Sequence, residues 1–254
     1  MHKTRIAIIV ILLTLLLPST LHVSAQDELR CSEDESISYL WQVQDEDCVF
    51  EQQISFSISI AFPTEITNYS FARQTIDEYF NERRAEFWSF ANDMDFTFGF
   101  LNPWSLDISY TVFQHSDRFL SLQFAESVYT GGAHPNLLFH TFSFDLETEQ
   151  VVSLGDIFVP DSTPLETIQP IIQFNLELQM TEMFGSITDL ERDWIMDGTG
   201  DDLNNYRNFA LTDDAVVFFF EPYQVAAYAA GPFTVEIPFT DLAGLLSDDL
   251  IVSQ

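Results

Sequence analysis

The sequence VYTGGAHPN, residues 128–136, forms a shaped connection around which the rest of the chain can be arranged. Its two glycines, Gly131 and Gly132, can adopt backbone angles that side chains forbid. Pro135 fixes its own φ and pushes the preceding His134 towards extended geometry. Apolar and polar residues alternate on both sides of this stretch, as is typical of half-buried strands. The pattern predicts a loop that projects from a sheet and holds an imidazole at a defined place.

Alternation with a period of two is clearest over residues 54–62, where Ile and Phe alternate with Ser and Ala. A hairpin is predicted from 106–112 and 120–124, and a further strand follows the glycines at 138–144. The wholly apolar run 216–220 predicts a buried strand. Residues 235–239 predict the last strand.

Two main helices are predicted. The first carries an aromatic stripe over residues 76–88, which we interpret as core packing, and Ser70 suits its N-cap. The second follows Thr163-Pro164-Leu165-Glu166 and stops at Gly185, with a kink or late restart expected at Pro170. A shorter helix is expected around 190–196. Strands grouped with helices, without regular βαβ alternation, predict an α+β fold with largely antiparallel sheets and two main helices packed on their faces.

The N-terminus predicts an export signal over residues 1–25. Lys3 and Arg5 precede an apolar core, and Val23-Ser24-Ala25 is a small-residue cleavage site. The apolar run is shorter than the about 20 residues that a membrane-spanning helix needs. We therefore expect an extracytoplasmic protein without a stable membrane span after cleavage. Retention of the segment as an uncleaved anchor stays open.

Residues 26–52 are acidic and polar, and they predict a tether. Cys31 and Cys48 are the only cysteines of the chain. In an exported protein they are expected to form a disulfide near the mature N-terminus. Two free thiols are the alternative.

The charge of the chain is strongly negative, with 40 acidic residues against nine basic ones and a formal net charge of −31. Such a charge disfavours nucleic acid and anionic lipid, and it speeds encounter with a basic partner. An adaptation for solubility explains the same composition.

Little in the sequence predicts catalysis. Three histidines, His115, His134 and His140, remain after signal removal, and there is no Gly-x-Ser-x-Gly elbow. His140 shares a strand face with Phe142 and is expected to be a satisfied core histidine, whereas His115 lies in a polar turn and is expected to be solvated. A zinc site that uses His134 and His140 matches no recognised spacing. No catalytic residue, metal or cofactor is therefore assigned.

The acidic stretch 193–204 partly matches a calcium-binding loop. Asp193, Asp197 and Asp201 stand at ligand positions, but Ile195 and Asn204 spoil two others. A solvated acidic loop is the simpler interpretation, and calcium binding stays open.

Two motifs in combination resemble a known family. The first is YTGGAH at 129–134 with LGDIF at 154–158, and the second is FEPYQVAAYAAG at 220–231 with VEIP at 235–238. In order and spacing they are similar to the extracytoplasmic region of RsiV-type anti-sigma factors, which also precedes the catalytic domain of PdaC-type peptidoglycan deacetylases. The resemblance divides the chain into a PdaC-like half at 53–148 and an RsiV-like half at 149–254.

The resemblance implies a binding surface, because this region of RsiV-type proteins binds lysozyme. Carried over to this chain, its ligand-binding residues are Gly131, Gly132, His134, Pro222, Tyr223 and Tyr228. We expect no anti-sigma activity, because no sigma-binding segment is recognised before the apolar run, and no deacetylase domain is recognised after residue 246. We therefore expect a non-enzymatic, exported module that engages a lysozyme-like basic protein or cell-wall glycan. The alternative is a cell-wall hydrolase or deacetylase-like enzyme, metal-assisted through His134.

Overall fold

The structure is a computed structural model that describes residues 41–44, 47–53, 56–93 and 104–251. The predicted signal at 1–25 and Cys31 lie outside the described residues, and of Cys48 only the backbone is described. The signal and the Cys31–Cys48 disulfide therefore stay predictions. In the described part of the chain, no helix has the length and apolar character needed to cross a bilayer.

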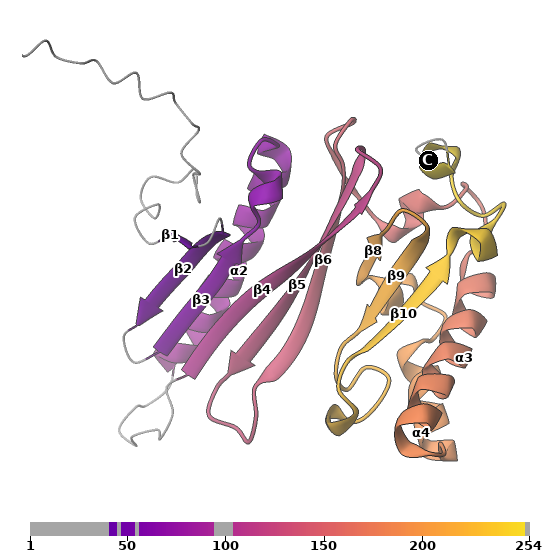
Figure 1. Cartoon of the computed structure of the whole chain (residues 1–254). Helices are drawn as coiled ribbons and strands as arrows, with labels where there is room; N and C mark the ends of the chain where they lie inside the picture. Colours follow the sequence, from indigo (N-terminus) through magenta and orange to yellow (C-terminus); the bar gives the residue numbers. More distant parts are fainter. Residues whose placement is uncertain (1–40, 45–46, 54–55, 94–103, 252–254) are drawn as a thin grey trace, which may run out of the picture.

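Helices and strands form four layers (Figure 1). A seven-stranded sheet has the order β1 (Trp41–Gln44), β2 (Asp47–Gln53), β3 (Phe56–Phe62), β4 (Trp104–His115), β5 (Phe119–Tyr129), β6 (Asn136–Asp145) and β7 (Gln150–Val152). A second sheet has the order β10 (Phe233–Pro238), β9 (Ala215–Phe220) and β8 (Phe209–Leu211). The helices are α2 (Ser70–Asp93), α3 (Leu165–Phe184), α4 (Asp189–Gly198) and the C-terminal α5 (Asp248–Ile251). Helix α2 covers the outer face of the large sheet, and α3 packs on the small one.

Neighbouring strands are antiparallel, except that β3 and β4 pair in parallel on either side of the crossover through α2. The predicted α+β class, with largely antiparallel sheets and two main helices on their faces, is confirmed. The C-terminal part of the predicted tether, residues 26–52, is not a linker but belongs to the large sheet. Residues 41–44 and 47–53 form β1 and β2, because β2 extends the sheet beside the strongly alternating β3.

The core of the large sheet lies between its strands and α2. Tyr79, Phe80 and Phe87 of α2 are buried against strand residues such as Phe124 and Leu106. The aromatic stripe is therefore core, as predicted. The helix begins at Ser70 itself rather than after it.

The core of the small sheet is separate. Every residue of β9 is buried, as its apolar run predicts, and Ile168, Ile172, Leu176 and Met180 of α3 pack in the same core. Gly185 ends α3 with a left-handed φ of 81°. The late restart expected at Pro170 is wrong, whereas the kink stays a prediction. Because this proline lies in the second turn, it removes one backbone hydrogen bond and the helix continues unbroken.

The two sheets are joined face to face by a third apolar cluster that includes Phe139 and Phe219. Side chains of the large sheet also accept hydrogen bonds from backbone N–H groups of β8, the edge strand of the small sheet. The Ser121 hydroxyl accepts a hydrogen bond of 3.1 Å from the Leu211 N–H, and the Thr141 hydroxyl accepts one of 3.0 Å from the Phe209 N–H. These contacts fix the N-terminal half against the C-terminal half.

His115 differs from its prediction as a solvated turn residue. It ends β4, is only 1% exposed, and lies between Phe119 and Phe239. Its Nε2 is 3.0 Å from the Leu250 carbonyl oxygen. The C-terminal α5 covers it, which the local polar sequence does not reveal.

Candidate functional site: an aromatic surface beside an apolar pocket

The glycine loop, residues 130–135 between β5 and β6, meets the tyrosine segment, residues 221–231 after β9. The His134 ring stacks on the Tyr228 ring with centroids 3.7 Å apart. The Tyr228 hydroxyl donates a hydrogen bond of 2.7 Å to the Pro135 carbonyl oxygen. Tyr223 lies beside Tyr228, with ring centroids 5.4 Å apart. We call His134, Tyr223 and Tyr228 the aromatic surface.

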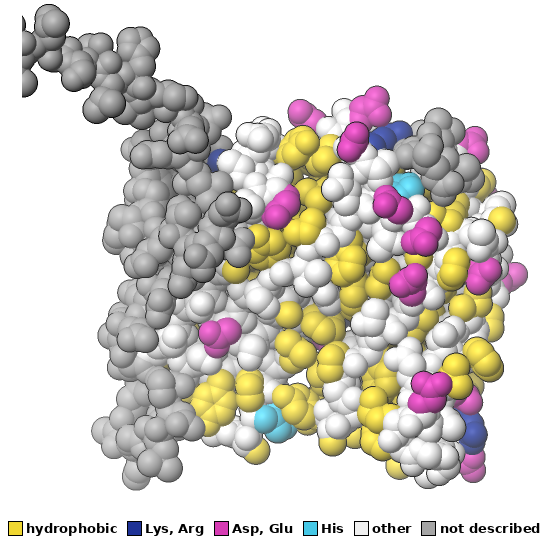
Figure 2. Space-filling model, in the orientation of Figure 1, with side chains coloured by type: hydrophobic (Ala, Val, Ile, Leu, Met, Phe, Trp, Pro, Cys, Tyr) yellow, Lys and Arg dark blue, Asp and Glu magenta, His cyan; other side chains and the backbone are white. Residues whose placement is uncertain are grey.

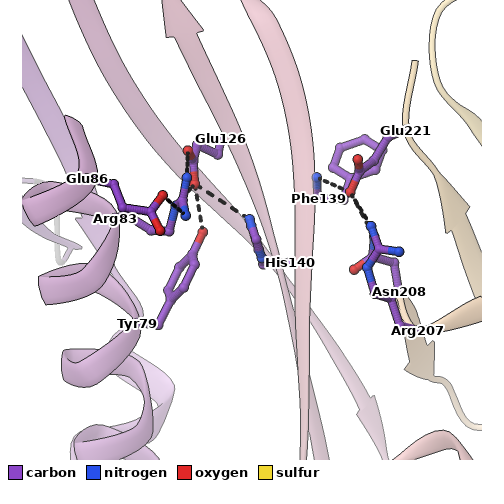
Figure 3. Close-up of polar contacts among 9 residues, drawn as sticks. All are labelled: Tyr79, Arg83, Glu86, Glu126, Phe139, His140, Arg207, Asn208 and Glu221. Carbon is purple, nitrogen blue, oxygen red and sulfur yellow. Dashed lines mark hydrogen bonds and ion pairs between the residues drawn. The ribbon is translucent and has the colours of Figure 1, made fainter. Parts of the chain in front are cut away.

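Local backbone geometry shapes both partners of this contact. Gly131 has a φ of 91°, a conformation that glycine adopts at little cost. Glu221, at the start of the tyrosine segment, accepts hydrogen bonds from the Phe139 N–H and the Asn208 amide, so the segment is anchored to β6 (Figure 3). The aromatic surface therefore rests on both halves of the fold.

Tyr223 is held in an uncommon conformation. Its φ is +74°, which costs a side-chain-bearing residue about 1–3 kcal/mol. The Trp194 indole N–H of α4 donates a hydrogen bond of 3.0 Å to the Tyr223 carbonyl oxygen. The Gln224 amide donates to the carbonyl oxygens of Gly198 and Asn205. These bonds present the Tyr223 side chain, 53% exposed, to solvent.

Helix α4 approaches this segment closely because residue 198 is glycine. A Cβ atom built on Gly198 would lie 2.0 Å from the Gln224 carbonyl oxygen. Any larger residue would force the helix and the tyrosine segment apart. We infer that Gly198 is needed for the position of Tyr223.

An apolar pocket of about 280 Å³ lies beside the aromatic surface. Helix α2, the ends of β4, β5 and β6, the glycine loop and the tyrosine segment all contribute to it. Pro222, Tyr223 and Tyr228 line one side, and Arg83 and Glu126 lie at its polar part. Pockets of this kind, at the junction of two halves of a fold, are common ligand sites.

A buried ion pair lies at this polar part (Figure 3). Glu126 of β5 is 1% exposed, and the Arg83 guanidinium donates to both of its oxygens at 2.8 and 3.0 Å. The Tyr79 hydroxyl donates to the same carboxylate. Burial and the Glu126 charge raise the pKa of Tyr79, so this phenol stays protonated.

His140 of β6 points towards Glu126 (Figure 3), with its Nε2 3.7 Å from a carboxylate oxygen. This nitrogen is buried and makes no hydrogen bond within the described residues. The prediction of a satisfied core histidine is therefore wrong, because the side chain is 35% exposed and its Nε2 lies too far from Glu126 for a hydrogen bond. Burial lowers the pKa of His140, and the Arg83 charge lowers it further against the opposing effect of Glu126.

The six predicted ligand-binding residues come together. Gly131, Gly132 and His134 lie in the glycine loop, and Pro222, Tyr223 and Tyr228 lie in the segment that contacts it. Ligand binding itself stays a prediction. Sequence reasoning missed Arg83, Glu126 and Trp194. The signal for Glu126 was present, because it occupies the core-facing alternate position of β5 between Phe124 and Val128.

The metal hypotheses do not match the geometry of the described part. No three His, Cys, Asp or Glu side chains within it are placed to hold a metal ion. His134 faces Tyr228, whereas His140 faces Glu126. Asp193 and Asp197 belong to helix α4, so the stretch 193–204 does not wrap as a calcium-binding loop.

Comparison with known families gives two matches along the chain. Residues 49–137 match the family described as deacetylase PdaC, and residues 155–240 match a protein family of unknown function, DUF3298. The resemblance to PdaC-type proteins inferred from the sequence motifs is confirmed.

Three similar proteins place these matches in context. Esterase Rv3036c from Mycobacterium tuberculosis is 28% identical over 190 residues, which cover 72% of this chain and 75% of the esterase. Peptidoglycan-N-acetylmuramic acid deacetylase PdaC from Bacillus subtilis is 26% identical over 148 residues, which cover 58% of this chain but 30% of the deacetylase. The crystal structure of a DUF3298 family protein from Pseudomonas aeruginosa superposes with a TM-score of 0.57 at 18% identity, covering 82% of this chain and 96% of that one. This last likeness shows a shared fold.

Proposed function

Since the chain joins a PdaC-type N-terminal region to a DUF3298 domain of unknown function, we propose that it is a non-enzymatic binding module of the cell envelope. Its partner is a basic, lysozyme-like protein, which docks on the aromatic surface. The relationship to a peptidoglycan deacetylase supports a role connected with the cell wall, and the N-terminal sequence supports an extracytoplasmic location.

The observation that carries this proposal is the convergence of the glycine loop and the tyrosine segment. Exposed tyrosines are common anchors of protein interfaces, because they add contact area at small entropic cost. Tyr223 is exposed and its backbone carbonyl is held by Trp194, so little conformational freedom is lost at this residue when a partner binds. A surface held in this way is suited to recognition.

The charge of the molecule supports a basic partner. Acidic side chains far outnumber basic ones on the face shown in Figure 2. With a formal net charge of −31, the chain attracts a cationic protein over distances of about a Debye length, roughly 8–10 Å at physiological salt. The association rate should therefore fall as salt rises.

Association with a c-type lysozyme at increasing ionic strength tests the proposal. We expect measurable binding at low salt and an association rate that falls with added salt. Soluble peptidoglycan fragments serve as a second ligand. Preferential binding to them would show that the partner is a glycan rather than a protein. No binding of either ligand at low salt would contradict the proposal.

A second candidate, a hydrolase acting on cell-wall material, is favoured by one observation. The similarity to an esterase covers 72% of this chain. His134 is its candidate general base, because the residue is exposed and its Nδ1 lies 2.9 Å from the Pro135 carbonyl oxygen. When Nδ1–H donates to this oxygen, the neutral ring carries its lone pair on Nε2, which can then accept a proton. Incubation with peptidoglycan and with a soluble ester, with and without chelator, tests this activity. Product that is lost in His134→Ala would support the hydrolase and argue against a pure binding module.

A further inference from the structure

We propose that the pocket beside the aromatic surface binds the hydrocarbon chain of a small uncharged amphiphile whose hydroxyl-bearing head lies at the rim. This inference goes beyond the proposed function, because it concerns a small ligand inside the pocket rather than a protein on the surface. Each of the two can hold without the other.

The walls of the pocket are mainly hydrocarbon. They are formed by Phe87, Phe90, Leu106, Val128, Leu137 and Leu138. Phe90 is 66% exposed, and Val128, Leu137 and Leu138 are half-buried, so part of this apolar lining is open to water. Covering such surface with another apolar group is favourable in proportion to the area removed from water. The lining therefore selects a hydrocarbon group.

The size of the pocket limits the occupant. An apolar protein cavity of about 150 Å³ holds one benzene molecule, and pockets for drug-sized ligands span about 300–1,000 Å³. At about 280 Å³ this pocket has room for a short alkyl chain. A chain of about eight carbons is the appropriate probe for a space near twice that of the benzene cavity.

The charges around the pocket disfavour an anionic head. Among the described residues that line it, Arg83 is the one basic residue, and its guanidinium is already paired with Glu126 and Glu86. The described lining thus holds two carboxylates, those of Glu86 and Glu126, and one guanidinium, and the chain as a whole has a strongly negative net charge. A fatty-acid carboxylate would meet repulsion here, whereas an uncharged head would not.

The rim offers partners for hydroxyl groups. Thr130 and Asn136 line the pocket and are exposed, and their side chains both donate and accept hydrogen bonds. The rings of Tyr223 and Tyr228 border the same opening and give an apolar face on which the C–H side of a sugar ring can pack. An alkyl glycoside combines such a head with the required chain.

A methyl NMR titration with n-octyl glucoside, below its micelle-forming concentration, tests the proposal. We expect saturable shifts of the Val128, Leu137 and Leu138 methyl signals. Methyl glucoside has the head without the chain, and octanoate has a chain of the same length with an anionic head. Both should bind at least about tenfold more weakly than octyl glucoside.

Variants locate the binding. Val128→Phe fills the pocket and should weaken octyl glucoside binding by about tenfold, whereas Phe174→Ala removes an apolar side chain of α3 that is 69% exposed and should leave binding unchanged. Equal binding of octanoate and octyl glucoside, or equal losses in the two variants, would overturn the proposal. If Val128→Phe fails to fold, the comparison of the three ligands on the unaltered chain still tests the proposal.

Discussion

The Tyr228 hydroxyl donates a hydrogen bond of 2.7 Å to the carbonyl oxygen of Pro135, a residue 93 positions earlier in the chain. The Tyr228 ring also stacks on His134, which directly precedes this proline. One tyrosine thus fixes the tip of a hairpin from the first half of the fold against a turn from the second half. This contact brings His134 and Tyr228 together in the aromatic surface.

Tyr228→Phe should separate the contribution of the hydrogen bond to stability from that of the ring stacking. Loss of the hydroxyl removes one hydrogen bond while the ring remains, so we expect the free energy of unfolding to fall by about 0.5–1.5 kcal/mol. Denaturant unfolding measures this change. Tyr223→Phe is the matched control, because the Tyr223 hydroxyl makes no hydrogen bond within the described part of the chain. Equal changes in both variants would show that the bond to Pro135 contributes nothing.

Trp194→Phe should loosen Tyr223 without damage to a core. The substitution keeps an aromatic ring on α4 but removes the N–H that binds the Tyr223 carbonyl oxygen. We expect the melting temperature to change little and binding of the protein partner to weaken by about threefold to tenfold, because Tyr223 must then be ordered on binding. Unchanged affinity would mean that the position of Tyr223 does not depend on Trp194.

Arg83→Met should be strongly destabilising. It leaves the Glu126 carboxylate buried without its ion-pair partner, and breaking such a pair costs about 3–5 kcal/mol. Arg192→Met on α4 is the matched control. Its side chain is 45% exposed and pairs with the exposed Glu177 and Asp189, so we expect a loss of at most about 1 kcal/mol. A similar small loss in both variants would show that water reaches Glu126.

His140 should make stability depend on pH. Its pKa in the folded chain lies below the ordinary value of 6.5, so the unfolded chain binds more protons. The free energy of unfolding therefore falls as the pH drops below about 6.5. His140→Gln cannot titrate and should flatten the profile between about pH 7 and 5.5. An unaltered slope in this variant would assign the pH dependence to other groups.

Much of the fold follows from local sequence patterns. The period of two predicted β3, and the stop signal at Gly185 predicted the end of α3, because alternation and a left-handed cap depend on neighbours along the chain. The parallel pairing of β3 with β4 was not predicted, since it depends on how α2 returns the chain to the sheet. The burial of His115 depends in the same way on α5, which is distant in sequence.

The sequence predicted the surface residues of the candidate site but not the residues that hold them in place. The glycine loop and the tyrosines were identified from two motifs, and the structure places them in contact. The roles of Trp194 and Gly198 were not predicted, because no local pattern shows that α4 packs against the tyrosine segment. The Arg83–Glu126 pair joins a helix to a strand 43 positions away, and only the packed structure brings them together.

The affinity of the mature protein for a c-type lysozyme at low salt, measured by calorimetry for the unaltered chain and for Tyr223→Ala, tests the central claim most directly. The Tyr223 side chain is exposed, so its removal should leave the melting temperature within a few degrees of the original. We predict that the dissociation constant rises at least about tenfold. Equal affinities for the two proteins, or no binding by either, would contradict the assignment of the aromatic surface as a recognition site for a lysozyme-like partner.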